Sequence, residues 1–411
     1  MTTELRNQRR QFWIILIIVF FGFLGISIPY LIFPPLFLNP DYSFLAGNWS
    51  ASSRALLLGV TLAVYPFGQF IGSPILGVLS DDYGRKHLIT GTLVLSGIGN
   101  LLVGIAIVKE QLLLLIISRF LTGLMEGNIA VARGMCADLK LLPKQETFGK
   151  LSAATSIAYL IGPFLGGLMT DRNLYADLNT STPFYFICVL FFALAALSML
   201  VLKETFVVDV PKIGTLWQRF NFLNRMRVLF SNKNLKTLMI TSTCLTLAVD
   251  MYYEFGPVYL TIKWTLMPAQ LIYYNGVLCL GLAIGYAWLP AFIASRMSNL
   301  WAILGAILGF ALLMVGIAWT NATSFMLLWF GLSGLVIGLA VTLLTVKISD
   351  CASDRIQGEV MGVQLSLRVL GDAIICLFGG VLLLVSPKII LILSAGIAIL
   401  TMFYYKRVYP K

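Results

Sequence analysis

The sequence is poor in charged residues and in the residue types that most enzymes and metal sites need. Only 11% of its 411 residues are charged, whereas a soluble domain carries about 25%. It has a single histidine, His87, and six scattered cysteines without a C-x-x-C pair, which argues against a metal site and a disulfide framework. It also lacks the phosphate-cradling G-x-x-x-x-G-K-[ST] pattern. We therefore expect no enzyme activity, no cofactor and no resident metal.

Apolar residues make up 59% of the chain, and the mean hydropathy is +0.89. These values indicate a protein that crosses a lipid bilayer several times. The net charge is +11, but no run of Lys and Arg is long enough to track a phosphate backbone, so we expect no nucleic-acid partner. The basic N-terminal stretch MTTELRNQRR precedes a long apolar run without an obvious cleavage site, which we interpret as a first span.

Spanning helices need about 20 mostly apolar residues. Irregular backbone cannot face lipid, so every span should be a helix. The sequence contains twelve such runs, at 12–37, 54–80, 88–108, 111–138, 148–170, 183–203, 235–262, 269–295, 300–319, 323–348, 358–386 and 388–405.

The basic residues in the loops and at the ends of these runs fall mostly on one side of the membrane. If the N-terminus is cytoplasmic, twenty Lys and Arg residues lie on the cytoplasmic side of the membrane and five lie on the opposite side. This positive-inside bias predicts that both termini are cytoplasmic. We expect the membrane to be a plasma membrane, which in a bacterium is the inner one.

The two halves of the chain show internal similarity. At an offset of 213, Gly166-Gly167 fall on Gly379-Gly380, and at an offset of 211, GLMEG (123–127) falls on GLVIG (334–338). The expected fold is all-α, with twelve transmembrane helices in two pseudo-symmetric six-helix bundles. The predicted domains are an N-terminal bundle at 1–203, a cytoplasmic linker at 204–234 and a C-terminal bundle at 235–411.

Residues 77–88, GVLSDDYGRKHL, resemble the signature G-x-x-x-D-R-x-G-R-K of the major facilitator superfamily, whose halves are parallel six-helix repeats. The matching residues are Gly77, Asp81, Gly84, Arg85 and Lys86. Asp82 stands where the pattern has a base. The resemblance implies a latch that helps close the cytoplasmic side, with Asp81 accepting hydrogen bonds from a neighbouring helix N-terminus or pairing with a base. The alternative is a solvated charged turn.

The run GKLSAATSIAYLIGPFLGG resembles the family's antiporter pattern G-x8-G-x3-G-P-x2-G-G. Its matches are Gly149, Gly162, Pro163, Gly166 and Gly167, and Ala158 replaces one Gly. Arg119 and Gly123 resemble the pattern R-x-x-Q-G, with Thr122 in place of Gln. These motifs are typical of the twelve-span drug/proton antiporters, including tetracycline pumps. The resemblance implies that small residues and a Pro bend this helix and let the halves rock.

Ionisable residues inside the spans are costly, so each is a functional candidate. Arg119, Glu126 and Arg133 recur every seven residues and should share a face of 111–138. The resemblance implies that this face lines a central cavity and that Arg119 takes part in proton handling. We expect Glu126 to titrate. The alternative is an Arg–Glu pair that only fixes helix packing.

Asp250 and Glu254 lie four residues apart in 235–262, so both project from one face. Two carboxyls this close in a low dielectric do not readily ionise together, so one of them tends to keep its proton. A site that takes up and releases protons needs a carboxyl of this kind. Arg368 and Asp372, also four apart, lie in 358–386, which should neighbour 235–262. We predict that Asp250 or Glu254 exchanges a proton with Arg368 as switching partner. The alternative is a static charge cluster.

The run 12–37 contains no acidic residue, whereas related drug pumps often have one there for cationic substrates. The expected substrate-contacting residues are Arg119, Glu126, Tyr30, Tyr253 and Lys347. The favoured hypothesis is a monomeric antiporter that exchanges protons for small amphipathic compounds. The alternative is a proton symporter that imports an anionic metabolite or a siderophore. A receptor or scaffold with a transporter fold is a third hypothesis.

Overall fold

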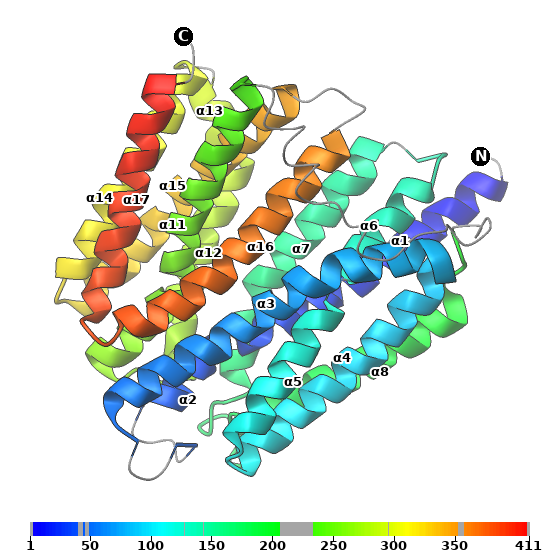
Figure 1. Ribbon diagram of the computed structural model, residues 1–411, viewed down its shortest axis with the longest axis horizontal. Coiled ribbons are helices and arrows are strands. Elements are labelled where there is room, and N and C mark those ends of the chain that lie inside the picture. Colours follow the sequence, from blue (N-terminus) through cyan, green and yellow to red (C-terminus); the bar gives the residue numbers. More distant parts are fainter. Residues whose placement is uncertain are drawn as a thin grey trace. The chain divides into compact units, whose positions relative to one another are not determined.

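The computed structural model describes residues 3–39, 44–45, 49–126, 128–142, 144–205, 233–294, 296–351 and 357–408, and the regular elements in these ranges are all helical (Figure 1). Eight helices of the described chain are long and apolar enough to cross a membrane. This confirms the predicted all-α membrane fold, while the count of twelve spans stays a prediction. The cytoplasmic linker predicted at 204–234 lies almost entirely outside the described residues.

Most helices begin and end within a few residues of the predicted spans, but α1 begins at Thr3 and not near residue 12. Their bounds are α1 (Thr3–Ser27), η1 (Ile28–Leu31), α2 (Phe33–Leu38), α3 (Ala51–Tyr83), α4 (Arg85–Val108), α5 (Leu112–Met125), α6 (Asn128–Asp138), α7 (Lys144–Leu168), α8 (Thr182–Val201), α11 (Lys233–Trp264), α12 (Pro268–Ala287), α13 (Leu289–Ala294), α14 (Asn299–Trp319), α15 (Thr323–Cys351), α16 (Gln357–Leu382) and α17 (Pro387–Val408).

Three predicted spans are divided rather than continuous. The run 12–37 becomes α1, η1 and α2, because prolines start the two short helices and cannot donate the hydrogen bond that would continue α1. The run 111–138 is broken after Met125, and the run 269–295 is broken at Trp288. By contrast, α11 continues through Pro257 to Trp264, so the helix does not end at the proline.

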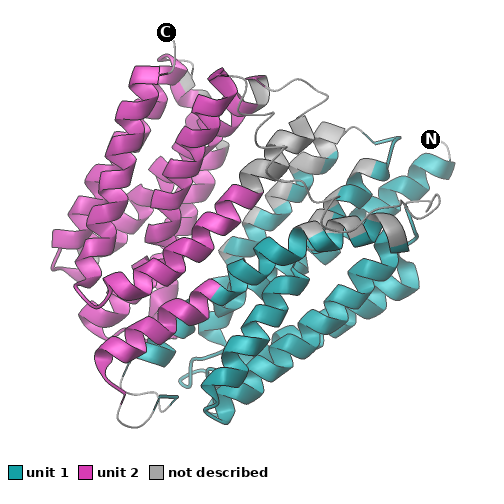
Figure 2. Cartoon of the chain, in the orientation of Figure 1, with its two compact units in different colours: residues 1–48, 64–220 teal, residues 49–63, 221–411 magenta. Residues whose placement is uncertain are grey.

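The chain folds into two compact units (Figure 2). Unit 1 comprises residues 1–48 and 64–220, and unit 2 comprises residues 49–63 and 221–411, so that α3 contributes to both. The core of unit 1 is apolar, with Ile15, Leu93 and Phe191 at 1% exposure. Such burial is expected where helices pack on one another and not on lipid.

The same helix pairings occur in both units. In unit 1, α4 packs on α5 and α8, and in unit 2 the corresponding α14 packs on α15 and α17. Gly68 and Gly72 of α3 lie against the backbone of α5, and Gly281 and Gly285 of α12, 213 positions later, lie against α15. Glycines allow these backbones to approach closely, which is how helices associate in lipid. The same helix pairings and glycine contacts therefore recur in both units, while the predicted domain boundaries stay a prediction.

Candidate functional site

The first group of intramembrane charges lies in unit 1, around Arg119 of α5. The Arg119 guanidinium carbon lies 4.3 Å from the ring centre of Tyr65 and 4.9 Å from that of Phe33. Cation–π contacts of this kind are strongest when the cation is desolvated, and Arg119 is buried. The two rings therefore hold the guanidinium in a fixed place inside the unit.

Glu126 lies at the end of α5, where the predicted span is interrupted. Its backbone N–H donates to the carbonyl oxygens of Thr122 and Gly123 at 3.2 and 3.1 Å, which tightens the last turn before α6. The buried carboxyl interacts electrostatically with the guanidinium of Arg119. The prediction that Arg119, Glu126 and Arg133 share one face assumed a continuous helix over 111–138. Because the helix is interrupted after Met125, the seven-residue spacing no longer places these side chains on one face. The Arg133 side chain lies outside the described residues.

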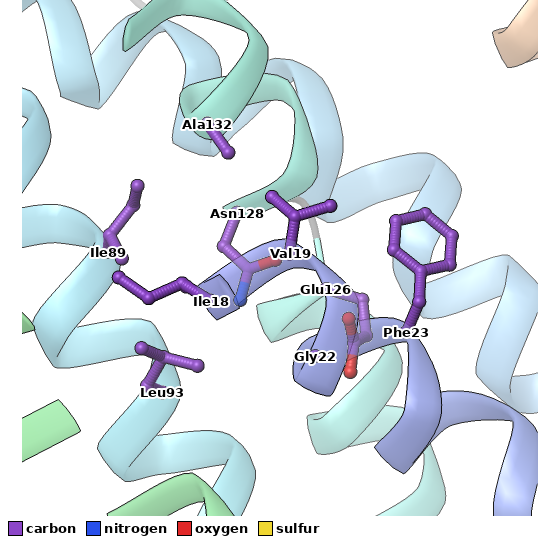
Figure 3. Close-up of a pocket in the computed structure, with 9 residues that line it drawn as sticks. All are labelled: Ile18, Val19, Gly22, Phe23, Ile89, Leu93, Glu126, Asn128 and Ala132. Atoms are coloured by element: carbon purple, nitrogen blue, oxygen red, sulfur yellow. The ribbon is translucent and has the colours of Figure 1, made fainter. Parts of the chain in front are cut away.

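A small cavity adjoins this group. Glu126 and Asn128, on either side of the break, face Ile18, Gly22 and Phe23 of α1 (Figure 3). Its volume of about 10 Å³ has room for about one water molecule. The cavity is thus suited to a proton or a water and is too small for an organic substrate.

The second group lies in unit 2, where α11 packs on α16 as the sequence predicted. Two Arg368 nitrogens, Nη2 and Nε, lie 3.3 and 3.4 Å from the two carboxylate oxygens of Asp250. The Asp250 side chain is 6% exposed, whereas that of Arg368 is 58% exposed. The guanidinium therefore covers a buried carboxylate from the accessible side and can move away without leaving a buried cavity.

Two further carboxyls belong to the Asp250–Arg368 group. Asp372 interacts electrostatically with Glu254, Asp250 and Arg368, and its Oδ1 accepts a long contact from the Cys376 thiol at 3.9 Å. Among the described residues, the group thus combines three carboxyls with one guanidinium. If all four were ionised, the group would carry excess negative charge in a low-dielectric core, and proton uptake would relieve it. The described residues include no set of His, Cys, Asp and Glu placed to hold a metal ion.

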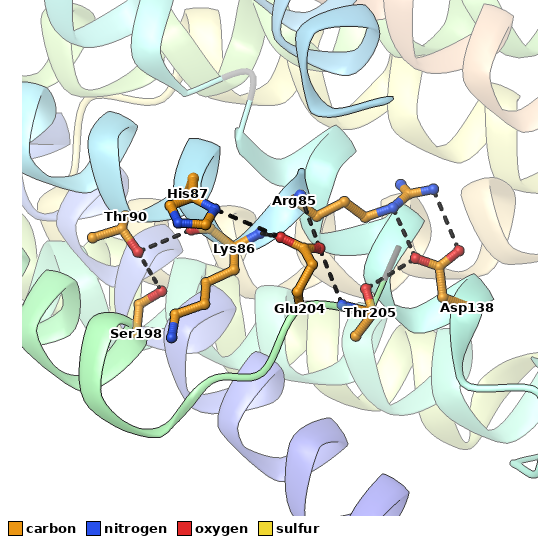
Figure 4. Close-up of polar contacts among 8 residues, drawn as sticks. All are labelled: Arg85, Lys86, His87, Thr90, Asp138, Ser198, Glu204 and Thr205. Atoms are coloured by element: carbon orange, nitrogen blue, oxygen red, sulfur yellow. Dashed lines mark hydrogen bonds and ion pairs between the residues drawn. The ribbon is translucent and has the colours of Figure 1, made fainter. Parts of the chain in front are cut away.

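The loop predicted to act as a latch is held by two acids that the sequence did not single out (Figure 4). Backbone N–H groups of Arg85 and Lys86, at the start of α4, donate to the Glu204 carboxylate at 3.0 Å each. The Arg85 side chain pairs with Asp138 of α6 at 2.8 Å, and Thr205 Oγ1 donates to the same carboxylate at 2.9 Å. Gly84 has φ +89°. The side chain of Asp81 and the surroundings of Gly77 lie outside the described residues.

The proposed bend motif places α7 directly on α1 and η1. Gly162 and Gly166 lie against Ser27 and Ile28, and Ser27 Oγ donates to the Ala158 carbonyl oxygen at 3.0 Å. Pro163 lies inside α7, and Gly167 is buried beside Gly166. Gly149 begins the motif within α7, but its surroundings are outside the described residues.

The other expected substrate contacts belong to different units. Tyr30 lies in η1 of unit 1, whereas Tyr253 in α11 and Lys347 in α15 belong to unit 2, and all three are half-buried. The residues that sequence reasoning missed are Tyr65, Phe33, Asp138 and Glu204. Their only sequence signal was an acid at each of two predicted helix ends and two aromatic residues among many.

Comparison with known proteins identifies a family for most of the chain. The model of the Major Facilitator Superfamily matches residues 15–376. A class H tetracycline resistance protein of Pasteurella multocida is 33% identical over 157 residues, 38% of this chain and 37% of the relative. Multidrug resistance protein 2 of Bacillus subtilis is 28% identical over 211 residues, 51% of this chain and 48% of the relative. The aligned parts therefore span between a third and a half of these relatives.

A solved structure shows the same fold. The crystal structure of a D-xylose–proton symporter superposes with a TM-score of 0.74 at 14% identity, and covers 97% of this chain and 98% of that one. Identity this low shows the fold alone.

Proposed function

The chain belongs to the Major Facilitator Superfamily and is a membrane transporter, and from this premise we propose that it is a proton-coupled antiporter that exports small amphipathic compounds. The observation that carries the proposal is the group formed by Asp250, Glu254, Asp372 and Arg368, in which Arg368 pairs with Asp250 and Asp372 interacts electrostatically with the other three. Such a group can load and release a proton when its surroundings change. The similarity to tetracycline and multidrug resistance proteins supports export of small molecules.

The proposed mechanism is alternating access around a mid-membrane site. When a carboxyl of the group is protonated, Arg368 loses a partner and can turn toward another carboxylate, either Asp250 on α11 or Asp372 one turn along α16. Protonation thereby changes which arrangement of α11 and α16 is favoured, and a ligand shifts the equilibrium by its differential affinity for the two states. Arg119 and Glu126 are proposed to provide a second proton-responsive group in unit 1.

A second candidate is a proton symporter that imports an anionic metabolite or a siderophore. The buried Arg119, held between two aromatic rings, favours it because a fixed guanidinium suits a carboxylate or phosphate. The absence of an acid from 12–37 points the same way.

Proteoliposomes with an acidic lumen distinguish the two candidates. Drugs, organic acids and siderophores are added outside while lumenal pH is recorded. An antiporter alkalinises the lumen when a transported compound enters, because protons leave in exchange. A symporter would instead take up the compound only when the gradient is reversed and the outside is acidic, and the lumen would then become more acidic. That result would replace the first proposal by the second. Transport without any proton movement would contradict both.

Asp250→Asn tests the role of the acidic group. We expect substrate-induced proton flux to fall to the level of protein-free liposomes, because a neutral amide cannot exchange a proton. The control is Asp177→Asn, which changes an exposed carboxyl in the loop after α7 and should leave the flux unchanged. Wild-type flux in Asp250→Asn would remove Asp250 from the mechanism.

A double variant separates coupling from stability. Arg368→Gln removes the base that pairs with the buried Asp250 and should lower the unfolding temperature, because an unpaired buried charge is destabilising. Asp250→Asn/Arg368→Gln removes both charges and should recover part of the stability while remaining uncoupled. A double variant no more stable than Arg368→Gln would show that the ion pair does not stabilise the fold.

A further inference from the structure

Three side chains form a continuous stack where α12 gives way to α13 in unit 2. The rings of Trp288 and Phe292 lie 4.7 Å apart with an angle of 27° between their planes. The Arg296 guanidinium carbon lies 3.7 Å from the centre of the Phe292 ring. Successive members are four residues apart, so they follow one another along consecutive turns. The stack fixes the plane of the guanidinium before any partner binds.

The Trp288–Phe292–Arg296 stack lies at the edge of the apolar spans, and its three side chains are exposed. The apolar part of α12 ends at Tyr286, and the next spanning helix, α14, begins at Asn299. Trp288 is 57% exposed, and Trp301, near the start of α14, is 58% exposed. Exposed tryptophans at the two ends of neighbouring spans are typical of the level of the lipid headgroups.

The stack also carries a positive charge without nearby acids in the sequence. From Phe255 to Ser349 the chain contains no Asp or Glu. No ion pair in the described part of the chain includes Arg296, whose guanidinium lies over the Phe292 ring. Because successive helices reverse direction, the same end of unit 2 carries the basic last turn of α17, Lys406 and Arg407. The same reasoning places Asp350, at the end of α15, and Glu359, at the start of α16, at this end as well, so the charge offered to an anion is that of the Arg296 guanidinium itself.

We propose that the Trp288–Phe292–Arg296 stack is a binding site for the phosphate of an anionic phospholipid. The guanidinium uses one face to stack on Phe292, which leaves its N–H edge to donate two hydrogen bonds to phosphate oxygens. The exposed indole of Trp288 lies against the glycerol and upper acyl region of the same lipid. The fixed guanidinium and the exposed tryptophan thus suit one occupant, an anionic phospholipid, which is distinct from the transported substrate.

Lipid retention measured by native mass spectrometry tests the proposal. The purified chain is incubated with phosphatidylglycerol or phosphatidylcholine in detergent, and the lipids that remain bound are counted. We expect wild type to retain one more phosphatidylglycerol than Arg296→Gln, and no such difference for phosphatidylcholine. The matched control is Arg407→Gln, which removes the same charge at the same end but lies outside the stack, and it should retain lipid like wild type.

Several outcomes would overturn the proposal. Equal retention by wild type and Arg296→Gln would do so, and an equal loss in Arg407→Gln would mean attraction by general charge. Displacement of the lipid by millimolar inorganic phosphate would mean a site for soluble anions. Phe292→Leu keeps the charge but removes the stacking face, so it should also lose the extra lipid. This variant keeps the test decisive if Arg296→Gln does not fold.

Discussion

At the scale of single residues, the turn between α3 and α4 depends on Gly84. Its φ of +89° and ψ of +146° belong to a region that side chains rarely enter. A Cβ built on Gly84 would also lie 2.6 Å from the Glu204 carboxylate oxygen. Glycine therefore both permits the turn and leaves space for the acid that binds the first N–H groups of α4. The helix N-terminus favours such an anion.

Replacement of Gly84 by Ala is expected to destabilise the protein by about 1–3 kcal/mol, because the backbone is strained and Glu204 is displaced. The control is Gly91→Ala, in the interior of the same helix, where a Cβ would meet nothing within 4 Å. Thermal unfolding in detergent should show a lower midpoint for Gly84→Ala and an unchanged or higher one for Gly91→Ala. Equal midpoints would contradict the role of Gly84.

At the scale of elements, the contact between α7 and α1 shows why small residues recur in the proposed bend motif. Gly166 lies against the Ile28 backbone, and its built Cβ would come 3.3 Å from the Ile28 side chain. Two helices this close cannot accept even a methyl group without a shift. The motif therefore has a packing role in unit 1, whatever it does during transport.

Gly166→Ala is expected to cost about 1–3 kcal/mol of stability through overpacking against η1. Gly22→Ala on α1 is the comparison, because a Cβ there would meet nothing within 4 Å. Unfolding midpoints measured side by side should fall for Gly166→Ala only. If both variants unfold at the wild-type temperature, the α1–α7 contact is looser than the structure indicates.

At the scale of the whole molecule, two features depend on the order in which the spans cross the membrane. One is the set of helix pairings that recurs in both units, and the other is the distribution of basic residues. Each unit pairs its helices in the same way. A wrong number of spans in either half would place many Lys and Arg on the outer side and destroy the positive-inside bias.

Reporter fusions test the predicted orientation. Alkaline phosphatase joined after Asp177, between α7 and α8, should be active, because it would be exported. The same reporter joined after Lys140, between α6 and α7, should be inactive, and green fluorescent protein joined after Lys411 should fluoresce. The opposite pattern would invert the topology and place the basic segments outside.

The sequence by itself determined the membrane class, the ends of most spans and the internal similarity of the two halves, because apolar runs and glycine spacing are properties of the linear chain. It also placed the acids and bases of α11 and α16 four residues apart on neighbouring helices. The roles assigned to them stay predictions.

Only the tertiary structure decided which side chains meet. The break at Glu126 could not be predicted, since an acid and a glycine within an apolar run do not by themselves end a helix. The rings of Tyr65 and Phe33 around Arg119, and the acids Asp138 and Glu204 at Arg85, come from segments far apart in the chain. Such contacts depend on how helices pack and turn about their axes, which no local pattern of residues specifies.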